Sequence, residues 1–454
     1  MLFHQDECKQ LEHHFGSSSN EIVVLYGDAD CSLSPILQTF LKNKSYYYFR
    51  ARSCSPKLQL QFFYDEIREQ LPKGLHFNMR YPDILSAMLS VPCQKRLIVI
   101  DDFMYLFKSE PSVMDEIVKI IHNKWNNQSV MFLLCTNDAL WVKRDMVKAL
   151  SDNAYEINAL IELKNASFRD FYAEMNGSDL SSAVMAYSIF GPSPDHLKML
   201  DPAASLQENI CRLILRKDSF FDQKSRHLLP DELREPSVYH TILSALALGK
   251  MKLNDLHIQT GYDRAKISVY IKNLNEHGIV EKIESFDAPG HENLQKGLYR
   301  ITDPFLRFYF RFIYPHESML AITEPERFYK KYIENDLYAY AAGTFTDVCK
   351  EYLYRLQETE DLDRSFTTFS TWYGKVGTID IIAANEDGTT LIGYCNYSKA
   401  KMSYADYEWN RYCMSQAKLV SDILYLFSLS SFDEKIKKEA ESDPSIVLIE
   451  DLTF

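Results

Sequence analysis

The chain has 454 residues, with 50 Lys and Arg against 63 Asp and Glu, which gives a formal net charge of −13. Apolar residues make up 46% of the chain and charged residues 25%, a globular composition that excludes a largely disordered protein. The acidic balance argues against a protein built mainly to coat nucleic acid, although it is compatible with one small DNA-contacting module. At about 100–200 residues per domain, the length predicts roughly two to four domains.

The sequence predicts a cytoplasmic protein with no membrane partner. No stretch approaches the roughly 18–20 apolar residues of a membrane span, and the polar N-terminal segment lacks the pattern of a secretory signal. The nine cysteines are dispersed without any C-x-x-C pair, which is typical of buried thiols in a reducing compartment rather than of a zinc or redox site.

Residues 1–164 alternate short apolar runs with helical patterns, and this alternation predicts a parallel α/β sheet of the P-loop NTPase type. Their nearly continuous apolar character indicates strands that are covered on both faces. The predicted strands are 21–26, 45–50, 96–102, 129–135 and 154–159. Helices are expected at 57–71 and 112–124.

The loop after the first strand, GDADCSLS, occupies the place of a phosphate-binding G-x-x-x-x-G-K-[ST] loop. Gly27 opens the pattern and Ser34 closes it, with a hydroxyl suited to Mg²⁺. The second glycine is replaced by Ser32 and the lysine by Leu33. Because an apolar side chain cannot neutralise phosphate, these residues taken alone favour a simple strand-to-helix turn without nucleotide.

The third predicted strand ends in Asp101 and Asp102, the arrangement of a Walker B motif. In that arrangement the first carboxylate holds Mg²⁺ through water, and the second position, usually Glu, orients the attacking water. Asp102 is one methylene shorter and is expected to act poorly, so an acidic pair that only caps a loop is the alternative. The fourth strand ends near Asn137, where a polar sensor of the γ-phosphate would lie.

Residues 165–236 are predicted to be helical, and 237–302 to form a winged helix-turn-helix with helices at 237–248, 252–260 and 263–277 and strands near 280–285 and 297–301. The third helix would bury Ile267, Ile271 and Leu274. Its outer face offers candidate DNA contacts, namely Lys266, Ser268, Lys272 and Asn275. This unit is almost neutral, with eight Lys/Arg and seven Asp/Glu, so docking of a protein partner is the alternative.

Residues 303–454 are predicted to form a restriction-endonuclease-like α/β domain with a helix at 324–358, strands near 379–384 and 389–395, and a helix at 404–428. Such sites combine an Asp with Glu-x-Lys on the next strand, and the set binds Mg²⁺. Asp380 is the candidate acid, but the next strand has Tyr394 and Asn396 at the Glu and Lys positions. Lys399 or Lys401 is the weaker alternative source of a lysine.

These patterns together resemble a prokaryotic family of AAA/STAND-like ATPases with an archaeal-type ATPase domain, a winged helix and a nuclease-like C-terminal domain of unknown function. The similarity extends over about residues 3–430. The most specific matching segments are 208–210, 228–239, 299–308, Phe345 with Cys349, 372–374 and 379–381.

The resemblance implies a P-loop ATPase domain coupled through a winged helix to a nuclease-like module. It places Gly27, Ser32, Leu33 and Ser34 on the phosphate loop and the acidic pair at the Mg²⁺ and water-orienting positions. The departures are systematic. The glycine-lysine pair and the arginine expected near Ala154 are missing, the first nuclease acid is Thr346, and Glu-Cys-Lys is replaced by the Tyr-Cys-Asn of residues 394–396.

Three hypotheses follow from the sequence. The first is an ATP-binding-family protein that binds ATP and Mg²⁺ weakly and is regulatory rather than an efficient enzyme. The alternative is a non-catalytic DNA-binding or protein-interaction scaffold that acts through the winged helix and the nuclease-like domain. The third is a Mg²⁺-dependent nuclease that uses Asp380.

Overall fold

The computed structural model describes the chain except for residues 1–3, 28–30, 32, 124–128, 176, 226–228, 230–232, 284, 287–296, 363–364, 375, 386–387, 451 and 453–454. Two compact units are present: Met1–Ala166 with Ser193–Asp195, and Ser167–Pro192 with His196–Phe454. The finer division into domains 1–164, 165–236, 237–302 and 303–454 stays a prediction. Among the described residues, no helix combines the length and the apolar character needed to cross a membrane.

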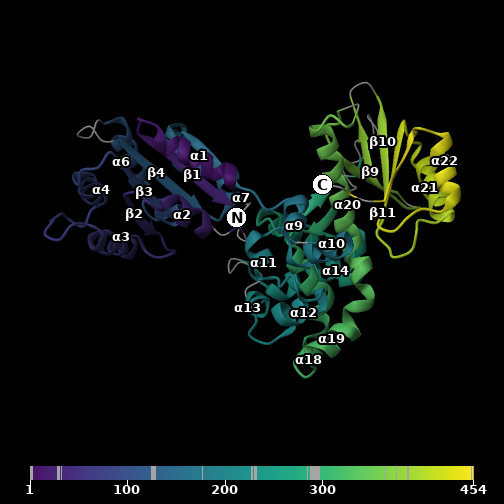
Figure 1. The fold of residues 1–454 in the computed structure, drawn as a ribbon. Helices are drawn as coiled ribbons and strands as arrows, with labels where there is room; N and C mark the ends of the chain where they lie inside the picture. Colours follow the sequence, from purple (N-terminus) through teal and green to yellow (C-terminus); the bar gives the residue numbers. More distant parts are fainter. Residues whose placement is uncertain are drawn as a thin grey trace. The chain divides into compact units, whose positions relative to one another are not determined.

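The first unit contains a five-stranded parallel sheet with the strand order β2-β3-β4-β1-β5 (Figure 1). The strands are β1 (Glu21–Gly27), β2 (Tyr46–Arg50), β3 (Lys95–Asp101), β4 (Ser129–Thr136) and β5 (Ala159–Leu163). The predicted α/β class with its P-loop-type sheet is therefore confirmed. Because all strands are parallel, their carboxyl ends lie at one edge of the sheet.

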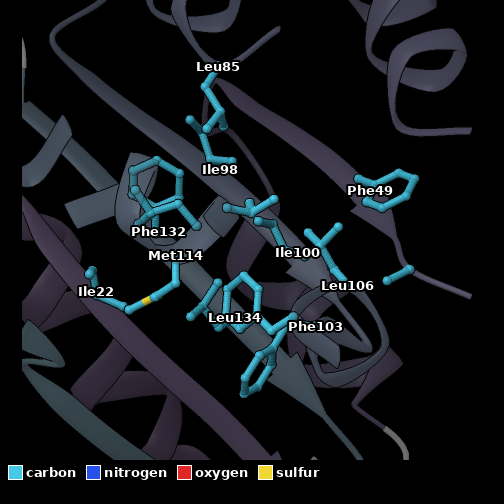
Figure 2. Packing of buried hydrophobic residues seen from close by; sticks show 14 of the residues in the cluster. Ile22, Phe49, Leu85, Ile98, Ile100, Phe103, Leu106, Met114, Phe132 and Leu134 are labelled. Atoms are coloured by element: carbon cyan, nitrogen blue, oxygen red, sulfur yellow. The ribbon is translucent and has the colours of Figure 1, made fainter. Parts of the chain in front are cut away.

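Helices cover both faces of this sheet, as the apolar strands require. On β1, Ile22 and Val24 belong to one buried cluster, whereas Val23 and Leu25 belong to another. Figure 2 shows the first cluster, in which Phe103 and Phe132 lie among aliphatic side chains. The helices are α1 (Gln5–Gly16), α2 (Ser34–Leu41), α3 (Pro56–Gln70), α4 (Tyr81–Ser90), α5 (Phe103–Ser109), α6 (Ser112–His122), α7 (Ala139–Arg144), α8 (Met146–Leu150) and the 3₁₀ helix η1 (Ser151–Glu156).

The second unit begins with the helical region expected from the sequence. Its elements are α9 (Phe168–Glu174), α10 (Leu180–Phe190), α11 (Pro194–Met199), α12 (Leu206–Ile210), the π-helical turn η2 (Cys211–Leu215) and α13 (Phe220–Ser225). A capping box fixes the start of α12, because Ser205 and Glu208 satisfy each other's backbone N–H groups.

Three helices and an antiparallel hairpin follow in the predicted order: α14 (Pro236–Ala247), α15 (Leu253–Thr260), α16 (Arg264–Glu276), β6 (Val280–Ile283) and β7 (Leu298–Ile301). The predicted stripe of α16 is buried, with Ile267 and Leu274 at 0% exposure and Ile271 at 2%. The interpretation of these three helices and the hairpin as a winged helix-turn-helix remains a prediction.

The aromatic segment after the hairpin folds into short helices that lead into one long helix. These are α17 (Pro304–Phe308), η3 (Tyr309–Ile313), η4 (Tyr314–His316), α18 (Glu317–Leu320), α19 (Pro325–Tyr332), η5 (Glu334–Asp336) and α20 (Leu337–Glu358). The single helix predicted at 324–358 is thus wrong only in its continuity, because two helices, α19 and α20, occupy this range. The polar Glu334–Asp336 turn interrupts it, as expected of Asn and Asp, which favour turns.

Helix α20 holds several parts of the second unit together. Its Glu351 carboxylate accepts hydrogen bonds from the backbone N–H groups of Phe168 and Arg169, at 2.9 and 3.0 Å, and so caps the start of α9. Its Asp347 carboxylate accepts a 2.9 Å hydrogen bond from Arg300 of β7. The same helix packs against β9 and β10.

The C-terminal part is a mixed five-stranded sheet with the order β12-β11-β10-β9-β8 (Figure 1). Its elements are β8 (Ser370–Tyr373), β9 (Thr378–Ala384), β10 (Thr390–Asn396), α21 (Tyr404–Ala417), β11 (Ile423–Ser428), α22 (Glu434–Ser442) and β12 (Ile446–Ile449). Helices cover both faces. On β11, Phe427 contacts Tyr352 of α20, whereas Leu426 shares a cluster with Tyr407 of α21.

Two of the predicted elements are displaced in the structure. The strand expected at 154–159 lies instead at Ala159–Leu163, because η1 occupies most of the predicted range. The helix expected at 404–428 ends at Ala417, where Lys418 adopts a left-handed conformation. The apolar run Ile423–Ser428 then forms the buried strand β11, because such a run is compatible with a strand as well as a helix.

Candidate functional site

The carboxyl edge of the first sheet brings most of the predicted nucleotide residues together. Strand β1 ends at Gly27, β3 ends at Asp101 and β4 ends just before Asn137. Because β4 lies between β1 and β3, Asn137 follows the strand between the predicted phosphate loop and the acidic pair. The predicted loop residue Ser32 lies outside the described residues.

Two residues of the predicted phosphate loop are explained by packing. The side chain of Leu33 is only 4% exposed and belongs to the buried cluster that includes Leu25 and Ile36. It therefore lies in the core rather than facing a phosphate. At Gly27, an added Cβ would come within 3.3 Å of Leu163 on β5, so close strand packing accounts for this glycine. Ser34, the predicted Mg²⁺ hydroxyl, is exposed at the start of α2.

The acidic pair at the end of β3 is hydrogen-bonded by two side chains of the neighbouring strand β2. Tyr48 Oη donates to Asp101 Oδ2 at 2.6 Å, and Arg50 Nε donates to Asp102 Oδ2 at 2.8 Å. Burial raises the pKa of Asp101, while the Tyr48 hydrogen bond partly opposes that rise. Asp102 lies in the left-handed region with a φ of 51°. Sequence reasoning missed Tyr48 and Arg50, which become neighbours of the pair only through the β2–β3 register.

This donor set does not fit a direct Mg²⁺ site. Mg²⁺ prefers unencumbered carboxylate oxygens in octahedral geometry, whereas the Asp101 and Asp102 oxygens described above already accept hydrogen bonds from Tyr48 and Arg50. Within the described part of the chain, no group of three His, Cys, Asp or Glu side chains could hold a metal ion.

Asn137 differs from the acidic pair because one of its side-chain atoms lacks a partner. Its Oδ1 is buried without a hydrogen bond. A buried polar atom without a partner costs free energy, and such atoms occur where a ligand or water completes the site. Asn137 Oδ1 is therefore left with the capacity to accept one hydrogen bond.

The candidate DNA contacts lie on α16 as predicted, but they do not share one environment. Lys266, Ser268 and Lys272 are exposed. Lys266 lies 3.8 Å from Glu235 and Lys272 lies 3.6 Å from Glu276.

Asn275 does not share that exposed face. Its Nδ2 donates to the backbone carbonyl of Val280 at 3.0 Å. This hydrogen bond links α16 to the start of β6, so the structure gives Asn275 a structural role.

Asp380 lies on β9 within a cluster that the sequence did not reveal. Its Oδ2 accepts a 2.9 Å hydrogen bond from the backbone N–H of Cys395. Burial raises the pKa of Asp380 to about 6. Lys350 reaches the same region from α20: its Nζ donates at 2.9 Å to Thr371 Oγ1, which donates at 2.8 Å to the Asp380 carbonyl.

Lys350 of α20 therefore lies near Asp380, the predicted nuclease acid. The sequence pattern places this lysine on β10 instead, at the position of Asn396. Neither of the predicted substitutes has a described contact with Asp380. Lys401 lies 3.6 Å from Asp433, and Lys399 lies over the ring of Tyr338. On the neighbouring strand β8, the backbone N–H of Tyr373 donates to Ser285 Oγ at 3.1 Å.

Comparison with known protein families gives a match to one region of the chain. Residues 309–407 match a family described as archaeal and bacterial proteins of unknown function. Over 385 residues, 84% of each chain, the sequence is 23% identical to the uncharacterized protein MJECL04 of Methanocaldococcus jannaschii.

Two solved structures are similar to part of the chain. The Walker-type ATPase PABY2304 of Pyrococcus abyssi is 12% identical, with a TM-score of 0.47 over 68% of this chain and 96% of that one. The ORC2 protein of Aeropyrum pernix is also 12% identical, with a TM-score of 0.41 over 71% and 94%. The assignment of the fold rests on the strand order of the chain itself. Residues 309–407 are thus similar to the archaeal and bacterial family of unknown function, and the α/β fold class of the first unit rests on its own parallel sheet.

Proposed function

We propose that the first unit binds a nucleotide such as ATP without efficient turnover, so that the protein is regulatory rather than catalytic. The buried, unpartnered Oδ1 of Asn137 at the carboxyl edge of the parallel sheet carries this proposal. Nucleotides bind at this edge in open parallel α/β sheets, and the unpartnered Oδ1 can accept a hydrogen bond from a hydroxyl or amino group of such a ligand or from a water bound to it.

Slow turnover follows from the state of the acidic pair. Asp102 occupies the predicted water-orienting position, but its carboxylate is paired with Arg50 at 2.8 Å. A carboxylate held in this way is a poor acceptor for a proton from water. Leu33 adds no positive charge at the loop, because a leucine side chain is uncharged, and here it is also buried in the core. Binding is expected to be weak for the same reason.

Thermal unfolding of the full chain with and without millimolar ATP tests this proposal. Binding to the folded state stabilises it by about 2.7 kcal/mol at a hundredfold excess over Kd, so the melting temperature rises. Asn137→Ala is expected to weaken binding about tenfold, in line with the loss of one hydrogen bond. Asn153→Ala, which removes an amide paired with Asp115 instead, serves as the matched control. An unchanged melting temperature in the wild type would contradict nucleotide binding.

The restoring variant Ser32→Gly/Leu33→Lys is a less direct test than the sequence suggests. Tighter ATP binding would be expected from the added charge, but Leu33 is 4% exposed and a lysine there starts from a buried position. Stability and affinity must therefore be measured on the same sample.

DNA binding through α16 is the second candidate, favoured by the exposed face that carries Lys266, Ser268 and Lys272. Surface ion pairs such as Lys272–Glu276 contribute little and can exchange for a phosphate contact. Lys272→Glu is expected to weaken salt-sensitive DNA binding. Normal binding by this variant would contradict the assignment of the contact face. Mg²⁺-dependent cleavage that Asp380→Ala abolishes would instead support the nuclease hypothesis.

A further inference from the structure

A cleft lies at the amino edge of the first sheet, opposite the edge that carries the candidate nucleotide site. Its volume is about 960 Å³, the size of a small-molecule site. The described residues that line it precede or begin the strands β1 to β4, and they are 15–20, 43–45, 93–95, 121–123 and Ser129. None of them belongs to the predicted phosphate loop or to the acidic pair, so the two sites are separate.

The lining of this cleft is polar, and its described residues include no Asp or Glu. Serine hydroxyls and Asn or Gln amides make up most of it, and the ionisable side chains are Lys44, Cys93, Lys95 and His122. Burial raises the pKa of the Cys93 thiol, so this group brings no negative charge at neutral pH. In a chain with a net charge of −13, a cleft lined in this way is better suited to an anion than to a cation.

A buried arginine lies next to the lining. Arg96 is 3% exposed, and its guanidinium donates to Ser45 Oγ at 2.7 Å and to the Val91 carbonyl at 2.6 Å. Its Nε is buried without a hydrogen-bond partner, and no described carboxylate lies within 4.0 Å of its nitrogens. A buried charge without a counter-ion costs free energy, which an anion in the adjoining cleft would offset.

Helix ends balance only part of this charge. Val91 lies at the end of α4, and the C-terminal end of a helix is equivalent to roughly −0.5 charge. Lys95 donates in the same way to carbonyls at the end of α1, at 2.6 and 2.9 Å, and it also faces the carboxylate of Glu21. The charge of Lys95 is therefore balanced locally, whereas about half of the Arg96 charge is not.

Ser45 connects the buried arginine with the cleft. It is exposed and lines the cleft, and its Oγ accepts the hydrogen bond from Arg96. The hydroxyl proton of Ser45 is therefore left to donate to a ligand. A hydroxyl that accepts from a guanidinium is polarised and becomes a better donor to an anionic oxygen.

We propose that this cleft binds a small phosphorylated polyol, such as a sugar phosphate, with Ser45 donating to the phosphate and Arg96 supplying the balancing charge. Phosphate oxygens are strong acceptors for such a donor. The Ser, Asn and Gln side chains of the lining both donate and accept, which suits the hydroxyl groups of a polyol. An inorganic phosphate would fill only a small part of the cleft. The site does not depend on nucleotide binding at the opposite edge.

Isothermal titration calorimetry of the full chain with glucose 6-phosphate tests the proposal, with glucose and inorganic phosphate as comparisons. Glucose 6-phosphate is expected to bind about tenfold more tightly than either, because it combines both kinds of contact. Ser45→Ala should weaken its binding about tenfold, the effect of one hydrogen bond to a charged acceptor. Ser45→Thr keeps the hydroxyl and should restore most of the affinity. Ser112→Ala removes an exposed serine of α6 that donates to Glu110, and it is the matched control.

Two further variants test the charge and the location. Arg96→Met should weaken binding about tenfold, because it removes a full charge beside the phosphate. Arg96 also holds the end of α4, so circular dichroism must verify that this variant is folded, and Ser45→Ala decides the outcome if it is not. Asn137→Ala changes the opposite edge of the sheet and should bind glucose 6-phosphate with wild-type affinity.

Absence of glucose 6-phosphate binding, or wild-type affinity in Ser45→Ala, would overturn the proposal. Equally tight binding of glucose would overturn the role assigned to the phosphate, and equally tight binding of inorganic phosphate would overturn the assignment to a polyol. Loss of binding in Asn137→Ala would locate the ligand at the nucleotide edge and so overturn its assignment to this cleft.

Discussion

The end of β3 and the middle of β9 both carry acids that the sequence marks as functional, but their charges are balanced differently. At β3, Asp101 and Asp102 receive hydrogen bonds from Tyr48 and Arg50 of the adjoining strand. At β9, Asp380 lies near a lysine that makes no ion pair with any described carboxylate. In the first region, side chains of the adjoining strand donate hydrogen bonds to both acids, whereas in the second the lysine pairs with a hydroxyl instead of a carboxylate.

The difference shows that loss of a catalytic motif does not have one structural outcome. In the first unit, Leu33 has joined the hydrophobic core and Arg50 pairs with an acid, so the remaining groups stabilise one another. In the second unit, no lysine occupies β10, but Lys350 from α20 places an amine in the same region. A motif that has lost its catalytic residues can thus leave polar groups that pair with one another, or leave charged groups without an ion-pair partner.

The largest expected effect comes from placing an unpaired charge in the first unit. Leu33→Lys should lower the free energy of unfolding by about 4 kcal/mol, because it removes core packing and buries an ammonium group. Leu58→Lys, at a position 43% exposed on α3, should change it by less than about 0.5 kcal/mol. Urea unfolding compares the two, and equal stabilities would refute the burial of Leu33.

Removing the charge of Asp380 on β9 should raise the free energy of unfolding, whereas Leu33→Lys lowers it. The folded-state pKa of Asp380 is about 6 against an ordinary value of 3.8, so the folded state binds the proton more tightly. Stability is therefore lost as pH rises from about 4 through 6, and the 2.2-unit difference corresponds to about 3 kcal/mol.

Asp380→Asn should accordingly raise the free energy of unfolding at pH 7 by up to about 3 kcal/mol and flatten its dependence between pH 4 and 6. Asn keeps an oxygen for the Cys395 N–H, whereas Asp380→Ala does not and should gain less. Urea unfolding across this pH range measures both. A destabilised Asn variant at pH 7 would argue against a buried, unfavourable charge.

A smaller loss is expected when the tyrosine partner of Asp101 is removed. Tyr48→Phe deletes a 2.6 Å hydrogen bond to a carboxylate and should cost about 1.5 kcal/mol. The loss should shrink in acid, where a protonated Asp101 needs the donor less. Tyr46→Phe on the same strand, at a position 43% exposed, is the control. Equal effects of the two substitutions would mean that the hydrogen bond contributes nothing.

Arg50→Ala should have the smallest effect, about 0.5–1 kcal/mol, because the Arg50 side chain is 63% exposed and solvent screens its ion pair with Asp102. The effect should diminish in 1 M salt. A loss that is large and independent of salt would show that packing of the arginine stem, rather than charge, holds β2 against the acidic pair.

The elements with strong periodicity could be predicted from the sequence, and those that depend on distant partners could not. The strands β1 and β4 and the buried stripe of α16 fell close to their predicted positions. The run Ile423–Ser428 was assigned to a helix because a short apolar run does not distinguish a buried strand from a helix. Only its pairing with β10 determines its state.

The candidate sites follow the same rule. Asp101, Asn137 and Asp380 could be found because each is a polar residue beside or within an apolar strand. Arg50 and Lys350 could not, because their relation to those residues depends on strand register and helix packing across about 30–50 residues of sequence. The structural role of Asn275 was also hidden, since a helical amide has the same sequence signal whether it faces DNA or a backbone carbonyl.

The cap that Glu351 places on α9 also has a consequence for how the second unit unfolds. Phe168 and Glu351 are far apart in sequence. Two backbone N–H groups at the start of α9 nevertheless depend on the Glu351 carboxylate of α20. Loss of α20 would therefore expose the start of α9 and free Arg300 from Asp347. We expect the helical region, the hairpin and the C-terminal sheet to melt in one cooperative transition, and a chain truncated before Leu337 to lose order well upstream of the cut.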